Sequence, residues 1–218
     1  MWVVKIGGSL GEHPTLREWL RHSARVGRGR VVIVPGGGRF ADQVRLAQKH
    51  WEFDDRIAHH MALLAMHQYG LVFQGLEPCL KSARTGQIDG LLRQGEAVVW
   101  LPELSELDRA EVPSDWTVTS DTLAAWLAGK LHAERLILVK SEHSAGTDPE
   151  TLKQSGIVDA AFLDWLPTHV ELNCFHRNQA DQFAEQLRRS GANHGQPTMA
   201  RIDDREDAET RQSLARGR

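Results

Sequence analysis

Residues 31–41 read Val31-Val32-Ile33-Val34-Pro35-Gly36-Gly37-Gly38-Arg39-Phe40-Ala41. The four apolar residues are typical of a short buried strand, and helical spacing predicts a helix over about residues 40–49. Three consecutive glycines cost backbone entropy, but they let a ligand approach the main chain, and the helix N-terminus offers it N–H groups and positive potential. The stretch therefore predicts a strand-to-helix corner that binds an anion. The alternative is a merely flexible loop.

The same alternation of apolar runs and helical spacing continues on both sides of this corner. It is the pattern of an α/β fold with a mostly parallel sheet covered on both faces. Such folds bind ligands at the carboxyl edge of the sheet, where the strand-to-helix loops lie. We predict further strands at 2–6, 98–101, 136–139 and 170–172, and further helices at about 15–26, 55–74, 122–131 and 178–189.

Composition excludes several classes of protein. The 218 residues are 41% hydrophobic and 25% charged, and the net charge is −3 at a pI of about 6.4. No excess of positive charge exists for nucleic acid or an anionic membrane, and no apolar stretch approaches the roughly 20 residues that span a bilayer. Cys79 and Cys174 are far apart, which argues against a disulfide scaffold or a zinc site. We expect a cytoplasmic protein that binds neither nucleic acid nor membrane.

A second glycine corner follows the predicted N-terminal strand directly. Lys5-Ile6-Gly7-Gly8-Ser9-Leu10 places two glycines where the backbone can turn sharply and bring N–H groups close to an anion. Lys5 stands at the end of an apolar strand, where a charged head is costly unless an anion meets it. The alternative is a plain strand–turn–helix corner from which Lys5 reaches water.

An acidic residue opens another predicted helix. Trp116-Thr117-Val118-Thr119-Ser120-Asp121-Thr122 ends a short extended run and begins that helix. Phosphoryl transfer needs a carboxylate near its lysines or its metal ion, and Asp121 is a candidate for this role. The alternative is that Ser120 or Asp121 only caps the helix or complements its dipole.

Taken in order, these motifs resemble those of the amino-acid-kinase superfamily. The order is a strand with Lys-x-Gly-Gly-Ser, a strand with Pro-Gly-Gly-Gly, Thr-Ser-Asp-Thr at a helix start, and a strand ending in Lys140. The resemblance covers roughly residues 2–190 and implies a three-layer αβα sandwich. Within the superfamily the chain looks most similar to the archaeal-type aminomethylfuran phosphate kinases of methanofuran biosynthesis, on residues 35–45, 60–66 and 116–122. That family phosphorylates the phosphate of an aminomethylfuran, which gives a diphosphate.

The resemblance implies an ATP-dependent phosphotransferase that uses Mg²⁺, acts on a small phosphorylated acceptor and forms a homo-oligomer. It implies catalytic roles for Lys5, Asp121 and Lys140, and no metal site made of protein side chains. The implied nucleotide-binding residues are Gly7, Gly8, Ser9, Ser120, Ser141 and Gly146, and the implied acceptor-binding residues are Gly36, Gly37, Gly38, Arg39 and His60. We expect one kinase domain over residues 1–190, with an acceptor lobe at about 1–115 and a nucleotide lobe at about 116–190. Residues 191–218 are expected to form a partly disordered tail.

Several alternatives stay open. Residues 140–149 depart from the Thr-Asp-Val-Asp-Gly-type loop of many relatives, so a non-catalytic nucleotide or phosphate sensor is one alternative. A kinase for another small acid, such as an amino acid or isopentenyl phosphate, is a second. A dinucleotide oxidoreductase is a third, supported only by the spacing of Gly36, Gly38 and Ala41. At the acceptor site, a tryptophan could stack on the aminomethyl cation or Asp42 could pair with it, and His60 could instead belong to the core or to an interface.

Overall fold

The computed structural model describes residues 1–142 and 147–193. The chain divides into two compact units, Met1–Leu187 and Arg188–Arg218, and the sheet and the candidate site belong to the first. Of the second unit the structure describes residues 188–193, which end a helix. The predicted tail at 191–218 begins within this helix and otherwise lies outside the described residues.

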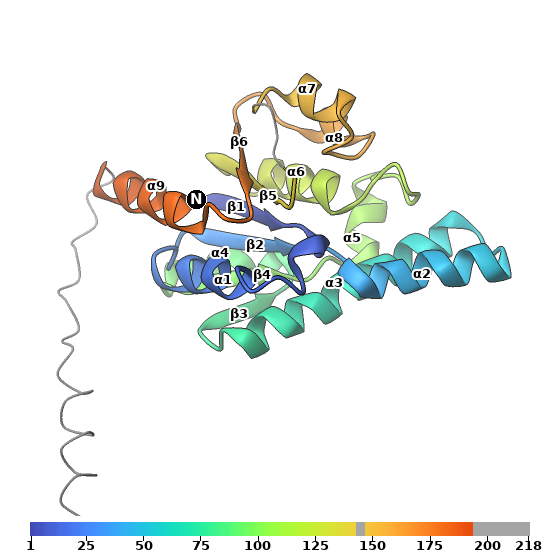
Figure 1. Cartoon of the computed structure of the whole chain (residues 1–218), viewed down its shortest axis with the longest axis horizontal. Helices are drawn as coiled ribbons and strands as arrows, with labels where there is room; N and C mark the ends of the chain where they lie inside the picture. Colours follow the sequence, from blue (N-terminus) through green and yellow to red (C-terminus); the bar gives the residue numbers. More distant parts are fainter. Residues whose placement is uncertain (143–146, 194–218) are drawn as a thin grey trace, which may run out of the picture. The chain divides into compact units, whose positions relative to one another are not determined.

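Six parallel strands form one sheet in the order β3-β4-β2-β1-β5-β6 (Figure 1). The strands are β1 (Trp2–Ile6), β2 (Val31–Pro35), β3 (Leu80–Ala83), β4 (Ala97–Trp100), β5 (Arg135–Lys140) and β6 (Glu171–His176). The register places Lys5 of β1 beside Val34 of β2 and Leu138 of β5. Every residue of β1 and β2 is buried, as expected for apolar strands in a parallel sheet covered on both faces.

Helices connect the strands and cover both faces of the sheet. They are α1 (Leu16–Arg25), α2 (Gly38–Trp51), α3 (Asp55–Leu76), α4 (Thr85–Arg93), α5 (Leu104–Arg109), α6 (Ser120–Lys130), α7 (Pro149–Gln154), α8 (Phe162–Trp165) and α9 (Ala180–Asn193), with a 3-10 turn η1 (Gly8–Leu10). None of the helices in the described part of the chain combines the length and the apolar character that crossing a bilayer requires.

Alternate residues of β1 enter two different hydrophobic cores. Trp2, Val4 and Ile6 pack in the core that includes side chains of α1 and α9. Val3 packs in the other core, to which α4 and α6 contribute. Because side chains alternate along a strand, Lys5 shares the side of Val3 and is directed toward the layer that contains α6.

The α/β sandwich predicted from the sequence is confirmed, and the predicted strands correspond to β1, β2, β4, β5 and β6. The sequence does not predict β3 or the helices α4, α5, α7 and α8. β3 reads Leu-Lys-Ser-Ala, lies at an edge of the sheet and keeps its two middle residues partly exposed. It therefore lacks the continuous apolar run that identifies the buried strands.

Candidate active site

Two lysines and an aspartate meet at the carboxyl edge of the sheet. Lys5 lies near the end of β1, Lys140 ends β5, and Asp121 lies in the first turn of α6. Asp121 Oδ1 is 2.8 Å from Lys5 Nζ, and Asp121 Oδ2 accepts a hydrogen bond of 2.7 Å from Lys140 Nζ. The exposed fractions of the Lys5, Asp121 and Lys140 side chains are 6%, 7% and 13%. The structure thus brings the three predicted catalytic residues together in one buried cluster.

Two ammonium groups face one carboxylate in this cluster, so its net charge is positive. Burial acts to raise the pKa of Asp121, but the charges of Lys5 and Lys140 outweigh burial and hold that pKa below its ordinary value. Burial, and then repulsion from Lys5, lower the pKa of Lys140 to about 8, although Asp121 opposes the change. Holding a second ammonium group in a buried site is unfavourable, and an anion bound at the cluster would relieve this.

Asp159, which no motif in the sequence marks, holds the start of α6. Asp159 Oδ2 accepts hydrogen bonds from the backbone N–H groups of Thr119, at 3.0 Å, and Thr122, at 3.1 Å. The hydroxyl groups of both threonines also donate to this carboxylate. Thr119, rather than Ser120 or Asp121, is the N-cap residue. The Asp121 side chain is therefore not used for capping and turns toward the lysines.

The two glycine corners contact each other through their backbones. A Cβ atom built on Gly8 would lie 2.4 Å from Gly38 N, and one built on Gly36 would lie 2.5 Å from Gly8 N. Gly38 also has a φ of +49°, and a Cβ atom there would lie 2.5 Å from the Tyr69 ring. Protein atoms therefore make the close approach that requires glycine here, and not a ligand, as the run of glycines in the sequence suggests.

The other described residues predicted to contact the nucleotide lie along the same edge. The hydroxyl groups of Ser9 and Ser141 are 2.7 Å apart, which joins the turn after β1 to the turn after β5. The backbone N–H of Gly7 donates a 3.2 Å hydrogen bond to β5. Ser120 begins α6, and Gly146 lies outside the described residues.

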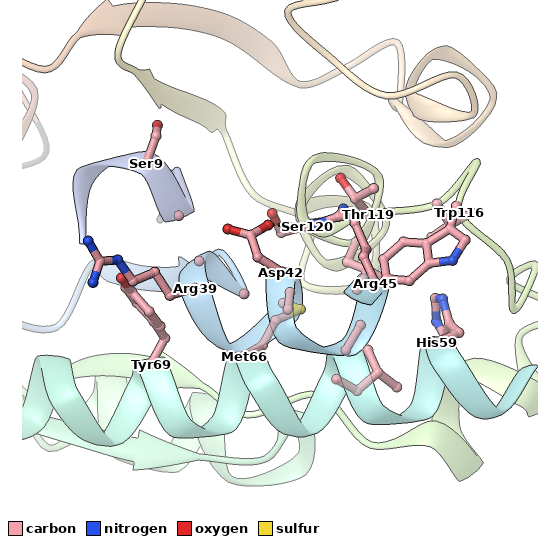
Figure 2. A pocket seen from close by; sticks show the side chains of 18 of the residues that line it. Ser9, Arg39, Asp42, Arg45, His59, Met66, Tyr69, Trp116, Thr119 and Ser120 are labelled. Carbon is pink, nitrogen blue, oxygen red and sulfur yellow. Dashed lines mark hydrogen bonds and ion pairs between the residues drawn. The ribbon is translucent and has the colours of Figure 1, made fainter. Parts of the chain in front are cut away.

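A cavity of about 390 Å³ lies beside the glycine corners, between η1, α2, α3 and the segment that precedes α6 (Figure 2). Of the predicted acceptor residues, Gly37, Gly38 and Arg39 line this cavity. Gly36 is buried against Gly8, and His60 is exposed on another side of α3. The histidine that lines the cavity is His59.

α2 begins beside this cavity at Gly38, and no side chain caps its N-terminus. The first N–H groups of a helix have no partner within the helix, and with the helix dipole they favour a bound anion. This end of the cavity therefore suits a phosphate group.

Sequence comparison matches the amino acid kinase family to residues 1–144 of the chain. The [5-(aminomethyl)furan-3-yl]methyl phosphate kinase of Methanocaldococcus jannaschii is 27% identical over 143 residues, which are 65% of this chain and 66% of that protein. The matched region thus spans slightly less than two thirds of the relative's length.

Solved structures with the same fold include three uridylate kinases. The enzyme from Archaeoglobus fulgidus has a TM-score of 0.60 at 14% identity and covers 85% of this chain and 94% of its own. The enzyme from Bacillus anthracis has a TM-score of 0.62 at 16% identity, with 85% and 91% covered. The enzyme from Ureaplasma parvum has a TM-score of 0.63 at 15% identity, with 83% and 91% covered.

Proposed function

Because the chain belongs to the amino acid kinase family, we propose that it transfers the γ-phosphoryl group of ATP to the phosphate of an aminomethylfuran methyl phosphate, in methanofuran-type cofactor biosynthesis. The observation that carries the proposal is the buried cluster of Lys5, Asp121 and Lys140, whose net positive charge lies at the carboxyl edge of the sheet. The relative from M. jannaschii, which is named for this acceptor, supports the choice of substrate.

The proposed reaction needs no general base. A phosphate oxygen of the acceptor is already ionised near pH 7; it attacks the γ-phosphorus of ATP, and the bond between that phosphorus and the leaving oxygen of ADP breaks. Two anions must meet for this, and unit charges about 4 Å apart repel by about 4 kcal/mol at an effective dielectric constant near 20. Positioning and charge neutralisation therefore account for catalysis.

In this proposal Lys5 and Lys140 neutralise the triphosphate and the transferring group, and Asp121 orients both ammonium groups. Ser9 and Ser141, whose hydroxyl groups are in contact, border the nucleotide. The N-terminus of α2 binds the acceptor phosphate, and the cavity beyond it holds the rest of the acceptor.

The described residues do not offer Mg²⁺ a ligand set. They contain no group of three or more His, Cys, Asp or Glu side chains that could hold a metal ion. Both oxygens of Asp121 face lysine ammonium groups at 2.8 Å and 2.7 Å. We therefore propose that Mg²⁺ arrives on the phosphates of ATP, and we assign no catalytic step to it.

We also propose that the enzyme is a homo-oligomer of the cytoplasm. Two cysteines that are not paired, Cys79 and Cys174, support a reducing compartment. Exposed large hydrophobic side chains among the described residues all lie on α2 and α3. On α3 they include Ile57, Leu64 and Leu71, which are seven residues apart and form one stripe along the helix. We propose that the same helix of a second copy covers this stripe in antiparallel orientation, in a contact centred on Leu64.

The proposed function is tested by measuring ADP release from ATP–Mg²⁺ with synthetic aminomethylfuran methyl phosphate. We expect release that depends on this acceptor, and phosphorus NMR signals of a diphosphate product. UMP, isopentenyl phosphate and N-acetylglutamate serve as control acceptors. Turnover with one of these in place of the furan would reassign the acceptor. No turnover with any of them, together with stabilisation by ATP in a thermal shift assay, would instead support a nucleotide sensor.

A further inference from the structure

His59 is a buried polar residue in the wall of the cavity. It is 4% exposed, and its Nε2 atom has no hydrogen-bond partner among the described residues. In Figure 2 its imidazole is directed from α3 toward Arg45 and Trp116. A buried nitrogen without a partner is unfavourable, and native proteins rarely keep one without a reason. His59 lines the cavity while Nε2 itself is covered by protein atoms, so a ligand in the cavity supplies the missing partner when the side chains over Nε2 move aside.

The other ring nitrogen determines what that ligand must offer. The backbone of Asp115 acts to raise the pKa of His59, and Nε2 is the ring nitrogen that has no hydrogen-bond partner among the described residues. A backbone carbonyl only accepts hydrogen bonds, so this interaction favours the tautomer that carries its proton on Nδ1. Burial lowers the pKa of His59, against the opposing effects of the Asp115 backbone and of the carboxylates of Asp115 and Asp108, while His60 also lowers it. The imidazole is therefore neutral near pH 7, and Nε2 presents a lone pair.

Charges near His59 favour a cation over an anion. The carboxylates of Asp115 and Asp108 place a negative potential at the ring. Arg45, a cation in the same wall, is already engaged. Its guanidinium group lies 4.4 Å from the centre of the Trp116 ring and 3.2 Å from Asp42 Oδ1.

We propose that His59 Nε2 accepts a hydrogen bond from the ammonium group of the acceptor, which makes His59 a specificity-determining residue for an amine-bearing phosphate. This inference rests on the proposed function. In Figure 2, Ser9 and Arg39 lie at the opposite end of the view from His59. An acceptor whose phosphate binds at the glycine corners can thus extend past the apolar wall of Leu63 and Met66 and bring its amine to His59.

The experiment compares two acceptors that differ in one group: the aminomethylfuran methyl phosphate and its analogue with a methyl group in place of the aminomethyl group. For the wild-type enzyme we expect kcat/KM to be at least about tenfold higher for the amine, because the analogue leaves Nε2 without a partner. His59→Leu should bring the two acceptors within about threefold of each other and leave the KM of ATP unchanged. His59→Gln, whose amide oxygen can accept a hydrogen bond, should keep part of the preference.

A measurement on the wild-type protein makes the test independent of whether the variants fold. The nitrogen NMR signal of His59 Nε2 should have the shift of an unprotonated nitrogen and should move when the amine acceptor binds, but not with the methyl analogue. Equal turnover of both acceptors by the wild type would overturn the inference and leave the proposed function intact. A full preference retained in His59→Leu would also overturn it. No turnover with either acceptor would overturn the proposed function and this inference with it.

Discussion

Replacing Lys5 by methionine tests the main catalytic assignment. Methionine approximates the volume of the side chain and removes its charge at a position that is 6% exposed. Asp121 then keeps one partner, Lys140 Nζ at 2.7 Å, in place of two. We expect the Lys5→Met variant to fold and to turn over at least about a hundredfold more slowly than the wild type.

Two general magnitudes support an effect of this size. Removing one preorganised charge-stabilising donor from an active site costs about 10²–10³ in turnover, which is about 2.7–4 kcal/mol. The Coulomb energy between an ammonium group and a unit charge about 4 Å away is about 4 kcal/mol at a dielectric constant near 20, which is of the same size. Leaving a buried charge with no partner costs roughly 3–5 kcal/mol of stability. The loss in Lys5→Met should be smaller, because Lys140 still pairs with Asp121.

The assay is steady-state ADP release at saturating ATP and acceptor, with circular dichroism and thermal melting to confirm the fold. Lys130→Met is a matched control, because Lys130 is exposed in the last turn of α6, at the other end of the helix that begins beside Asp121. It makes the same change in charge and should keep turnover within about threefold. A folded Lys5→Met enzyme with turnover that close to the wild type would refute the assignment of Lys5.

Three further predictions concern protonation, helix placement and assembly. Lys140 has a pKa of about 8 in place of 10.5, so in the free enzyme it loses its proton as pH rises through 8. Bound nucleotide phosphates favour the charged lysine and should keep it protonated. Nucleotide binding should therefore weaken above pH 8 and be accompanied by proton uptake, which is measured by calorimetry in buffers of different ionisation enthalpy. Lys140→Arg, which stays charged, should show no uptake, and uptake in that variant would contradict the reasoning. Asp159→Asn should lower stability by about 1–2 kcal/mol in a thermal melt and lower turnover about tenfold, because it weakens the hydrogen bonds that hold the start of α6. The control Asp164→Asn, at an exposed position, should change neither stability nor turnover. Leu64→Glu should reduce the mass measured by light scattering to that of a smaller assembly, and an unchanged mass would remove α3 as the interface.

The sequence predicts Lys5 from its place at the end of an apolar strand and Lys140 from the resemblance to amino-acid kinases, and two physical rules explain why both lysines reach the site. A charged residue at the end of an apolar strand is unusual, and the carboxyl ends of parallel strands share one edge of the sheet. Lys5 and Lys140 meet both conditions, and the register of β1 with β5 then brings them to the same carboxylate. Asp159 meets neither rule. Its partners lie 37 and 40 residues away, and no local pattern marks it.

The sequence also does not predict which face of α3 is buried, and the reason is different. His59, Leu63, Met66, Gly70 and Phe73 share the buried face, but a second apolar stripe of the same helical spacing runs through Ile57, Leu64 and Leu71 on the exposed side. Hydrophobic periodicity identifies a buried face only when the opposite face is polar. With two apolar stripes the sequence cannot decide which of His59 and His60 enters the cavity, and contacts with the rest of the fold decide it.

The glycine corners show that residues predicted to form an anion site can be glycine for a second reason. The sequence places an anion at Gly36–Gly38 because side chains are missing there, yet Gly8 and Gly38 are needed first for contact between the two corners. A Cβ atom at Gly8 would overlap the backbone at 2.4 Å, which no side-chain movement can relieve. Gly8→Ala must therefore shift the corners whether or not a phosphate binds between them, so its loss of activity would not distinguish the two explanations. Lys5→Met can distinguish them, because it leaves the backbone contact intact and removes only the charge that an anion would meet.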